Sequence, residues 1–255
     1  MVAGVDTGSY TQATRVGRLV TTLGDDELLL IRMDAEERLS EPFTITIHAL
    51  AIKAQPIHTL LGTSVSVQID AGGDTFHNRW FNGVLWEYEE LGRDERGYEY
   101  RLILRPKTEF LTLNRRNRIF QKKSVKDIAD ALIGEVTEDR QFKLSGTYSP
   151  LEYCVQYQES DWDFVARLLE YEGIYYFFEH GDGVHKLVLV DDRNSHVDLE
   201  PASVPVAVGP EGHDAAVVWN VTERRGIGPA KVTVDDYDFE KPTVKLAREK
   251  AAAKI

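Results

Sequence analysis

Short segments in which apolar and polar residues alternate constrain this chain most. Residues 43–47 read Phe-Thr-Ile-Thr-Ile and residues 65–69 read Val-Ser-Val-Gln-Ile. A period of two places successive side chains on opposite faces, as in a half-buried β-strand. Between residues 15 and 105 such segments recur at regular spacing, with glycine turns such as that at 71–74. This pattern predicts a closed or nearly closed β-barrel.

Helical signals interrupt the strands at three places. Residues 125–133 carry apolar side chains at helical spacing after a Ser124–Asp127 capping pair, and Gly134 follows as a stop. A second helix is predicted to begin at Ser160 and to end by Gly173. A third is expected after Pro242, within residues 241–255.

The order of the elements indicates the fold class. Two apolar runs, 174–180 and 184–190, flank Gly-Asp-Gly and predict a hairpin. Strands precede and follow the helices without a βαβ rhythm, which argues against a doubly wound parallel sheet. The sequence predicts a mainly β protein with inserted helices, an α+β arrangement.

The charge of the chain is unevenly distributed. The net charge is −12, yet residues 101–126 hold nine basic residues and only one acidic residue. A net acidic protein is a poor general binder of nucleic acid, because phosphate contacts need clustered bases. The basic segment is either a solvated face or a contact for an acidic partner, including another copy of the chain.

Aromatic residues cluster in the middle of the chain. Ten of the 25 aromatic residues lie between positions 148 and 178. In the strand at 174–180, Tyr175 and Phe177 face one side, and Ile174, Tyr176 and Phe178 face the other. Both faces are therefore covered, either within a two-sided core or at a subunit interface.

No residue pattern for catalysis, a cofactor or a metal is predicted. His180 and His185 flank the hairpin, but two imidazoles without a placed carboxylate make a weak metal site. The single cysteine, Cys154, is expected to be a buried apolar residue. The acidic doublets beginning at Asp191 and Asp235 leave a carbohydrate-active enzyme as an alternative.

Two further classes of protein are weighed. Trp80 and Trp86, if exposed, allow a glycan-binding β-barrel. The longest apolar runs have about five residues where a span needs about 20, so no stable membrane insertion is expected. The first twenty residues lack the basic start and apolar block of a signal peptide.

Three segments resemble the VgrG family, the spike proteins of bacterial type VI secretion. The segment Tyr153–His180 is very similar to a signature stretch of that family. Residues 100–125 and Tyr237–Pro242 agree with it, and the resemblance covers about residues 15–250.

The resemblance implies the fold of the contractile phage tail hub, with two barrel-like β-domains. We expect a flexible N-terminus at 1–14, a first domain at 15–110 and a second domain with helices at 111–240. The C-terminal helix at 241–255 would lead into an oligonucleotide-fold domain and a needle that this chain lacks.

The resemblance also implies a structural role. The chain would be a homotrimeric hub that caps an Hcp-type hexameric tube and contacts type VI baseplate components. PAAR-type tip proteins and effectors would bind only through the missing C-terminal part. Assembly in the bacterial cytoplasm would precede secretion or injection without a signal peptide. The alternative within this class is the baseplate hub of a contractile phage tail or tail-like bacteriocin.

Seven residues are the predicted interaction residues, because they belong to the basic segment or to the aromatic strand: Arg115, Arg116, Arg118, Lys122, Lys123, Tyr175 and Phe177.

Overall fold

The computed structural model describes residues 10–70, 79–197, 205–206, 218, 220–223 and 226–251. The chain divides into two compact units, one of Met1–Pro205 with Gly212–Val217 and one of Val206–Glu211 with Val218–Ile255. The turn predicted at 71–74 lies outside the described residues, as do positions 1–9 of the predicted flexible N-terminus.

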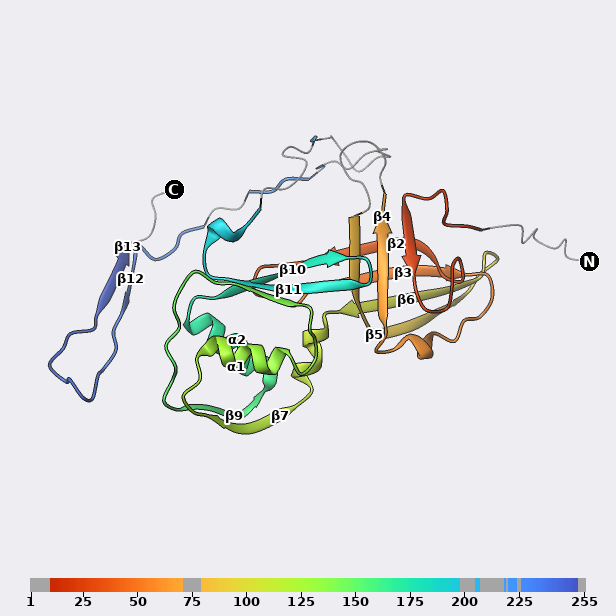
Figure 1. Ribbon diagram of the computed structural model, residues 1–255. Helices are drawn as coiled ribbons and strands as arrows, with labels where there is room; N and C mark the ends of the chain where they lie inside the picture. Colours follow the sequence, from red (N-terminus) through yellow and green to blue (C-terminus); the bar gives the residue numbers. More distant parts are fainter. Residues whose placement is uncertain are drawn as a thin grey trace, which may run out of the picture. The chain divides into compact units, whose positions relative to one another are not determined.

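An antiparallel six-stranded sheet forms the first half of the larger unit (Figure 1). Its strand order is β1-β4-β5-β6-β3-β2. The strands are β1 Gly17–Val20, β2 Leu29–Glu36, β3 Thr44–Ala51, β4 Ser64–Ile69, β5 Arg79–Arg93 and β6 Tyr98–Arg105. A short 3-10 helix, η1 Ile57–Leu60, precedes β4.

A buried glutamine bridges the two end strands of this sheet. Gln12 Oε1 accepts hydrogen bonds from the backbone N–H of Leu19 in β1 and of Leu30 in β2, both at 2.9 Å. The side-chain amide completes the bridge by donating to Leu19 O at 3.3 Å. The sheet is therefore a nearly closed barrel, as the spacing of the strands predicts.

Alternation along the strands builds the barrel core. Ile45 and Ile47 of β3 and Val65 and Val67 of β4 are fully buried, in agreement with the period-two pattern. They pack with Phe43, Leu102 and Leu104 in one apolar cluster.

The second half of the larger unit surrounds a separate apolar core. Helices α1 Val125–Ile133 and α2 Asp161–Tyr171 contribute most of its buried side chains. The remaining elements are η2 Lys107–Thr112, β7 Arg115–Phe120, β8 Arg140–Lys143, β9 Cys154–Ser160, β10 Tyr175–Gly181, β11 Val184–Val190 and η3 Arg193–Ser195. Strands β7 and β9 form a two-stranded ribbon, and β10-β11-β8 form a three-stranded sheet.

Local capping explains where the two helices begin. The Ser124 hydroxyl accepts from Asp127 N–H, and the Asp127 carboxylate accepts from Ser124 N–H, which is a complete capping box. At α2, the Ser160 hydroxyl accepts from Asp163 N–H at 3.0 Å. Gly173 follows α2 with a φ of +72°, a conformation that favours glycine. Both predicted helices are confirmed.

The β10–β11 hairpin belongs to both cores. Tyr176 and Leu189 are buried in the second core, whereas Phe178 packs against both clusters. The Phe178 ring meets the barrel residue Phe43 edge-on, with 4.9 Å between ring centroids. This hairpin therefore joins the two halves of the larger unit, the barrel and the second core, which we call its two lobes. Within the described residues, no helix is both long and apolar enough to cross a membrane.

The smaller unit contains an antiparallel pair, β12 Lys231–Val234 and β13 Arg248–Ala251. The helix predicted for 241–255 is wrong for its described part, because residues 248–251 are extended and paired with β12. The backbone hydrogen bonds of this pairing override the helical propensity of the alanine-rich segment. The chain is mainly β with inserted helices, as predicted.

Candidate interaction surface

The basic segment of the sequence includes β7, one strand of the β7–β9 ribbon, where alternate residues face different surroundings. Arg116 and Arg118 are half-buried, whereas Arg115 and Ile119 are exposed. Ile119 pairs with Val155 of β9. One face of the ribbon therefore meets the helices, and the other face is open.

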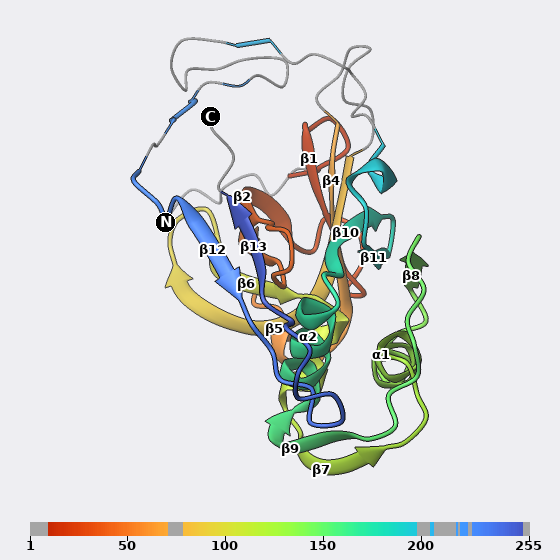
Figure 2. The same cartoon turned by 90° about the vertical axis from the view of Figure 1, so that its left-hand side faces the viewer.

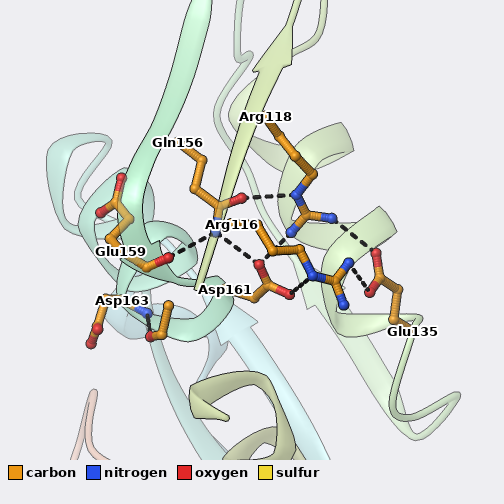
Figure 3. A network of polar contacts seen from close by, with 8 residues as sticks. Arg116, Arg118, Glu135, Gln156, Glu159, Asp161 and Asp163 are labelled. Atoms are coloured by element: carbon orange, nitrogen blue, oxygen red, sulfur yellow. Dashed lines mark hydrogen bonds and ion pairs between the residues drawn. The ribbon is translucent and has the colours of Figure 1, made fainter. Parts of the chain in front are cut away.

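Arg116 and Arg118 face a buried carboxylate (Figure 3). Asp161, the first residue of α2, is fully buried. Its Oδ1 accepts from Arg118 Nη2 and from Gln156 Nε2, the latter at 2.8 Å. Its Oδ2 lies 3.5 Å from Arg116 Nε. Two of the predicted interaction residues thus neutralise a charge inside the protein.

The same two arginines also reach α1 and β9. The carboxylate of Glu135, just after α1, forms ion pairs with both arginines. Its Oε2 lies 3.3 Å from Arg116 Nη1, and its Oε1 lies 3.1 Å from Arg118 Nη1. Arg118 Nε donates to Gln156 Oε1 at 2.8 Å. Together these contacts tie β7, β9, α1 and α2 to one another.

The other three basic residues of the prediction remain at the surface. Arg115, Lys122 and Lys123 are exposed, and none of them forms an ion pair with the part of the chain that the structure describes. Their neighbours on the ribbon include exposed apolar groups, with Ile119 58% and Tyr157 68% accessible. Tyrosine and arginine are enriched in protein–protein contacts, whose rims are polar and exposed, so this face is a candidate contact surface.

Tyr175 and Phe177 lie on β10 and contact the same histidine. The rings of both residues stack on His196, with centroid distances of 5.7 and 5.1 Å. The Tyr175 hydroxyl and His196 Nε2 are 2.9 Å apart. Both side chains are half-buried, on a different sheet from the basic residues of β7.

His180 and His185 are opposite each other in the hairpin, with ring centroids 6.5 Å apart. All four ring nitrogens have protein partners. Asn82 N–H donates to His180 Nδ1 at 3.1 Å, and Lys107 N–H donates to His185 Nε2 at 2.9 Å. Glu37 Oε1 lies 3.0 Å from His180 Nε2, and Asn82 Oδ1 lies 2.7 Å from His185 Nδ1.

These contacts define the protonation of the pair. A nitrogen that accepts from a backbone N–H carries no proton, so neutral His180 is protonated at Nε2 and neutral His185 at Nδ1. Burial lowers the pKa of His185 to about 3, with smaller contributions from His180 and Lys107. The pair joins barrel strand β5 to the β10–β11 hairpin. No cluster of three metal-ligating residues occurs in the described ranges.

The carboxylates considered for catalysis have other partners. Asp191 accepts from the backbone N–H groups of Ser145 and Gly146 and from the Tyr148 hydroxyl. These bonds, led by that of Ser145, hold the pKa of Asp191 well below its usual range. Burial and the bond to Asp191 raise the pKa of Tyr148 to about 12. These hydrogen bonds hold the loop at residues 145–148 against the end of β11.

Asp235, the other candidate carboxylate, belongs to the smaller unit and accepts from Asp236 N–H. The tryptophans considered for glycan binding are half-buried. Trp86 packs against Phe110 with 5.2 Å between ring centroids. Its contact with η2 thus uses part of the surface that a sugar would need.

Sequence reasoning missed three buried polar residues. Gln12 was assigned to the flexible N-terminus, but the structure buries it between β1 and β2. Asn82 is the one polar side chain in the run Trp80–Trp86. That position could have indicated a buried polar contact. Asp161 falls in the first turn of the second predicted helix, where the sequence gives no sign that its carboxylate is buried.

Comparisons with known proteins agree with this geometry. The family model described as phage tail baseplate hub (GPD) matches residues 36–254. The type VI secretion system spike protein VgrG1a of Pseudomonas aeruginosa is 34% identical over 254 residues, 95% of this chain and 39% of the relative. VgrG1c of the same organism is 32% identical over 245 residues, 93% of this chain and 33% of the relative. The chain thus spans less than half the length of these relatives.

A solved structure gives the same result for the fold. The E. coli c3393 protein matches with a TM-score of 0.57 and 19% identity, over 84% of this chain and 56% of that one. That protein is a component of the type VI secretion system and is structurally similar to the T4 tail proteins gp27 and gp5. The similarity to VgrG proteins inferred from residues 153–180 is therefore confirmed.

Proposed function

Since the chain belongs to the phage tail baseplate hub family, we propose that it forms the structural hub of a type VI secretion spike. The observation that carries the proposal is the identity of 34% to VgrG1a along nearly the whole chain. The fold similarity to c3393 supports it independently of the sequence.

The finer proposal concerns assembly. Three copies would form a ring that caps a hexameric Hcp-type tube, with residues 15–110 and 111–240 as the two hub domains of each copy. Closed rings of identical subunits use two different, complementary patches on each copy. The open face of the β7–β9 ribbon supports such a contact, because it carries cations and exposed apolar groups together. Baseplate components would contact the same ring. The hub would take part in effector delivery as a component of the assembled spike.

Two measurements test the proposal. Light scattering behind a sizing column should give the mass of three 28.9 kDa chains as concentration rises. Co-sedimentation with preassembled Hcp-type tubes should place the chain in the pellet. A chain that neither associates nor pellets with tubes, even when extended to the full length of its VgrG relatives, contradicts the proposal.

A second candidate is the hub of a contractile phage tail or tail-like bacteriocin. The matching family model, which is described as a phage tail baseplate hub, favours it. The neighbouring genes distinguish the two, because a phage tail hub lies among tail genes and a type VI hub lies among secretion genes.

A further inference from the structure

The tip of the β10–β11 hairpin lies on the barrel and is held there by polar contacts. The tip runs from His180 to His185 and ends beside β4 and β5 (Figures 1 and 2). Gly183 N–H donates to Ser66 Oγ of β4 at 3.3 Å. In β5, Asn82 N–H donates to His180 Nδ1 at 3.1 Å, and Asn82 Oδ1 accepts from His185 Nδ1 at 2.7 Å. Both histidines therefore belong to the contact between tip and barrel, which we call the tip contact.

The position of the His185 ring leaves no acceptor for a second ring proton. His185 is 3% exposed. Its Nδ1–H donates to Asn82 Oδ1, and its Nε2 accepts from the backbone N–H of Lys107 at 2.9 Å. A proton added at Nε2 would meet that N–H group, so two donors would face each other and a backbone hydrogen bond would be lost. Protonation therefore requires the ring to leave this position.

The charges around the two histidines do not compensate for a second proton on His185. The groups that face the pair come from the β2–β3 loop, β5, η2 and the residue before β8: Glu37, Arg79, Lys107 and Asp139. Glu37 lies 3.0 Å from His180 Nε2, and Asp139 lies 3.0 Å from Lys107 Nζ. Within the described residues, no carboxylate forms an ion pair with His185. Burial, with smaller contributions from His180 and Lys107, lowers its pKa to about 3 despite the opposite effect of Asp139.

The base of the same hairpin is fixed independently of the tip. Tyr176 and Leu189 are buried in the second core. From Leu187 to Val190, β11 also pairs with β8. Phe178 lies between the tip and the base and packs against Phe43 of the barrel. The tip can therefore move off the barrel while the base keeps its place in the second lobe.

We propose that the tip contact is sensitive to acid: when His185 binds a second proton, the hairpin tip leaves β4 and β5 while the base of the hairpin stays in the second core. A proton binds the released tip more tightly than the held tip, so acid shifts the population toward release. Release uncovers Phe43, whose ring packs against those of His180 and His185. The contact lies entirely within the larger unit, so its release does not depend on the proposed hub function.

Three backbone amides report directly on release, because each donates its hydrogen bond within the tip contact: Asn82, Lys107 and Gly183. Hydrogen exchange of the wild-type chain is measured by NMR at pH 6 and pH 5. Division of each rate by the intrinsic rate at that pH gives the opening constant of the amide. We expect these constants to rise about eightfold from pH 6 to pH 5, because the released His185 titrates with its ordinary pKa of 6.5 and the held one does not.

The amides held by Gln12 are the internal control, because their hydrogen bonds do not involve the hairpin. Leu19 N–H and Leu30 N–H both donate to Gln12 Oε1, which does not titrate. Their opening constants should not change over the same pH interval. An equal rise at both would show that acid unfolds the whole unit rather than releasing the tip, which contradicts the proposal.

Three variants test the assignment of the proton to His185. His185→Gln keeps an acceptor for the Lys107 amide but has no titratable group, so the opening constants should be the same at both pH values. Ser66→Ala is the matched control, because it removes the acceptor of the Gly183 amide. It should raise the opening constant at every pH and leave the ratio between pH 5 and pH 6 at about eight. His180→Gln should also keep this ratio.

The wild-type ratio alone can overturn the proposal, without any variant. Equal opening constants at pH 6 and pH 5 would show that the tip contact does not respond to acid. A ratio of about eight that persists in His185→Gln, or that disappears in His180→Gln, would show that another group takes up the proton. A ratio near one in His185→Gln alone, with the wild-type ratio in the other two variants, would establish the acid-sensitive contact.

Discussion

At the scale of single residues, Asp161 is the most demanding group in the protein. Its carboxylate is fully buried at the start of α2. A buried charge is tolerated only when it is paired and hydrogen-bonded, and removing one partner leaves it uncompensated. Arg118 supplies the closest positive charge and also orients Gln156.

Replacing Arg118 should therefore destabilise the fold. We expect Arg118→Met to lower the free energy of unfolding by about 3–5 kcal/mol, because Asp161 loses its main partner. Urea denaturation followed by tryptophan fluorescence measures this. Arg115→Met is the matched control and should be neutral, since Arg115 is exposed on the same strand. A double variant with Asp161→Leu should recover much of the loss. Equal stability of the two single variants would contradict the assignment.

His185 predicts a pH dependence of stability. Its folded pKa is about 3 and the ordinary value is 6.5, so the unfolded chain binds the proton more readily. The stabilisation is complete above pH 6.5 and is lost as pH falls toward 3, at about 1.4 kcal/mol per pH unit. The charged and titratable groups that act on His185 are His180, Lys107 and Asp139, and they are the same in every protein compared.

Chemical denaturation between pH 6.5 and 5 isolates this histidine. The pKa of Glu37 is lowered from 4.5 by its bond to His180, so its contribution is lost only at still lower pH. His185→Gln can keep both hydrogen bonds without titrating, and its stability should be nearly flat over this interval. An unchanged slope in that variant would show that another group is responsible.

At the scale of elements, the closure of the barrel depends on Gln12. Its amide replaces the strand-to-strand hydrogen bonds that would otherwise join β1 to β2. We expect Gln12→Ala to cost about 1–3 kcal/mol, because the N–H groups of Leu19 and Leu30 lose their acceptor. Hydrogen exchange should accelerate at these two amides first. Tyr10→Ala, two residues earlier and exposed, should leave both protected.

The helix boundaries could be predicted from the sequence because their signals are local. Ser124, Asp127 and Ser160 act within one turn of the residues that they cap. The hairpin at 181–183 was predicted for the same reason. Residues 248–251 were predicted incorrectly because their conformation depends on a partner strand 14 or more residues earlier.

The candidate surface could be predicted only in part. The basic segment was visible in the sequence, but the division between Arg115 outside and Arg116 and Arg118 inside was not. That division depends on which face of the ribbon meets Asp161, which is 43 residues from Arg118 in the chain. Gln12 and Asn82 were missed because their partners are likewise distant in sequence.

At the scale of the whole larger unit, Asn82 connects the two lobes. Its side-chain amide donates to Ser64 and Ser66 of the barrel, each at 2.8 Å. Its carbonyl oxygen and backbone N–H contact the two histidines of the β10–β11 hairpin. One barrel residue thus fixes the position of a hairpin about 100 residues away.

The two lobes should therefore unfold as one cooperative unit. Trp80 reports on the barrel and Trp162 on the second core, and their fluorescence transitions should coincide in the wild type. Asn82→Ala should lower stability by about 2 kcal/mol or more and separate the two transitions. Single-tryptophan proteins measure each lobe. Separate transitions already in the wild type would contradict the coupling.

The shared hairpin has a consequence for dissecting this protein. A fragment that stops at residue 110 contains every strand of the barrel, yet it lacks the aromatic side chain that covers Phe43 and both histidine partners of Asn82. Such a fragment would expose an apolar surface and a polar group together, and would aggregate on expression. The smallest portion that can be excised and still fold therefore extends through β11 and includes Asp191, which holds the loop at residues 145–148.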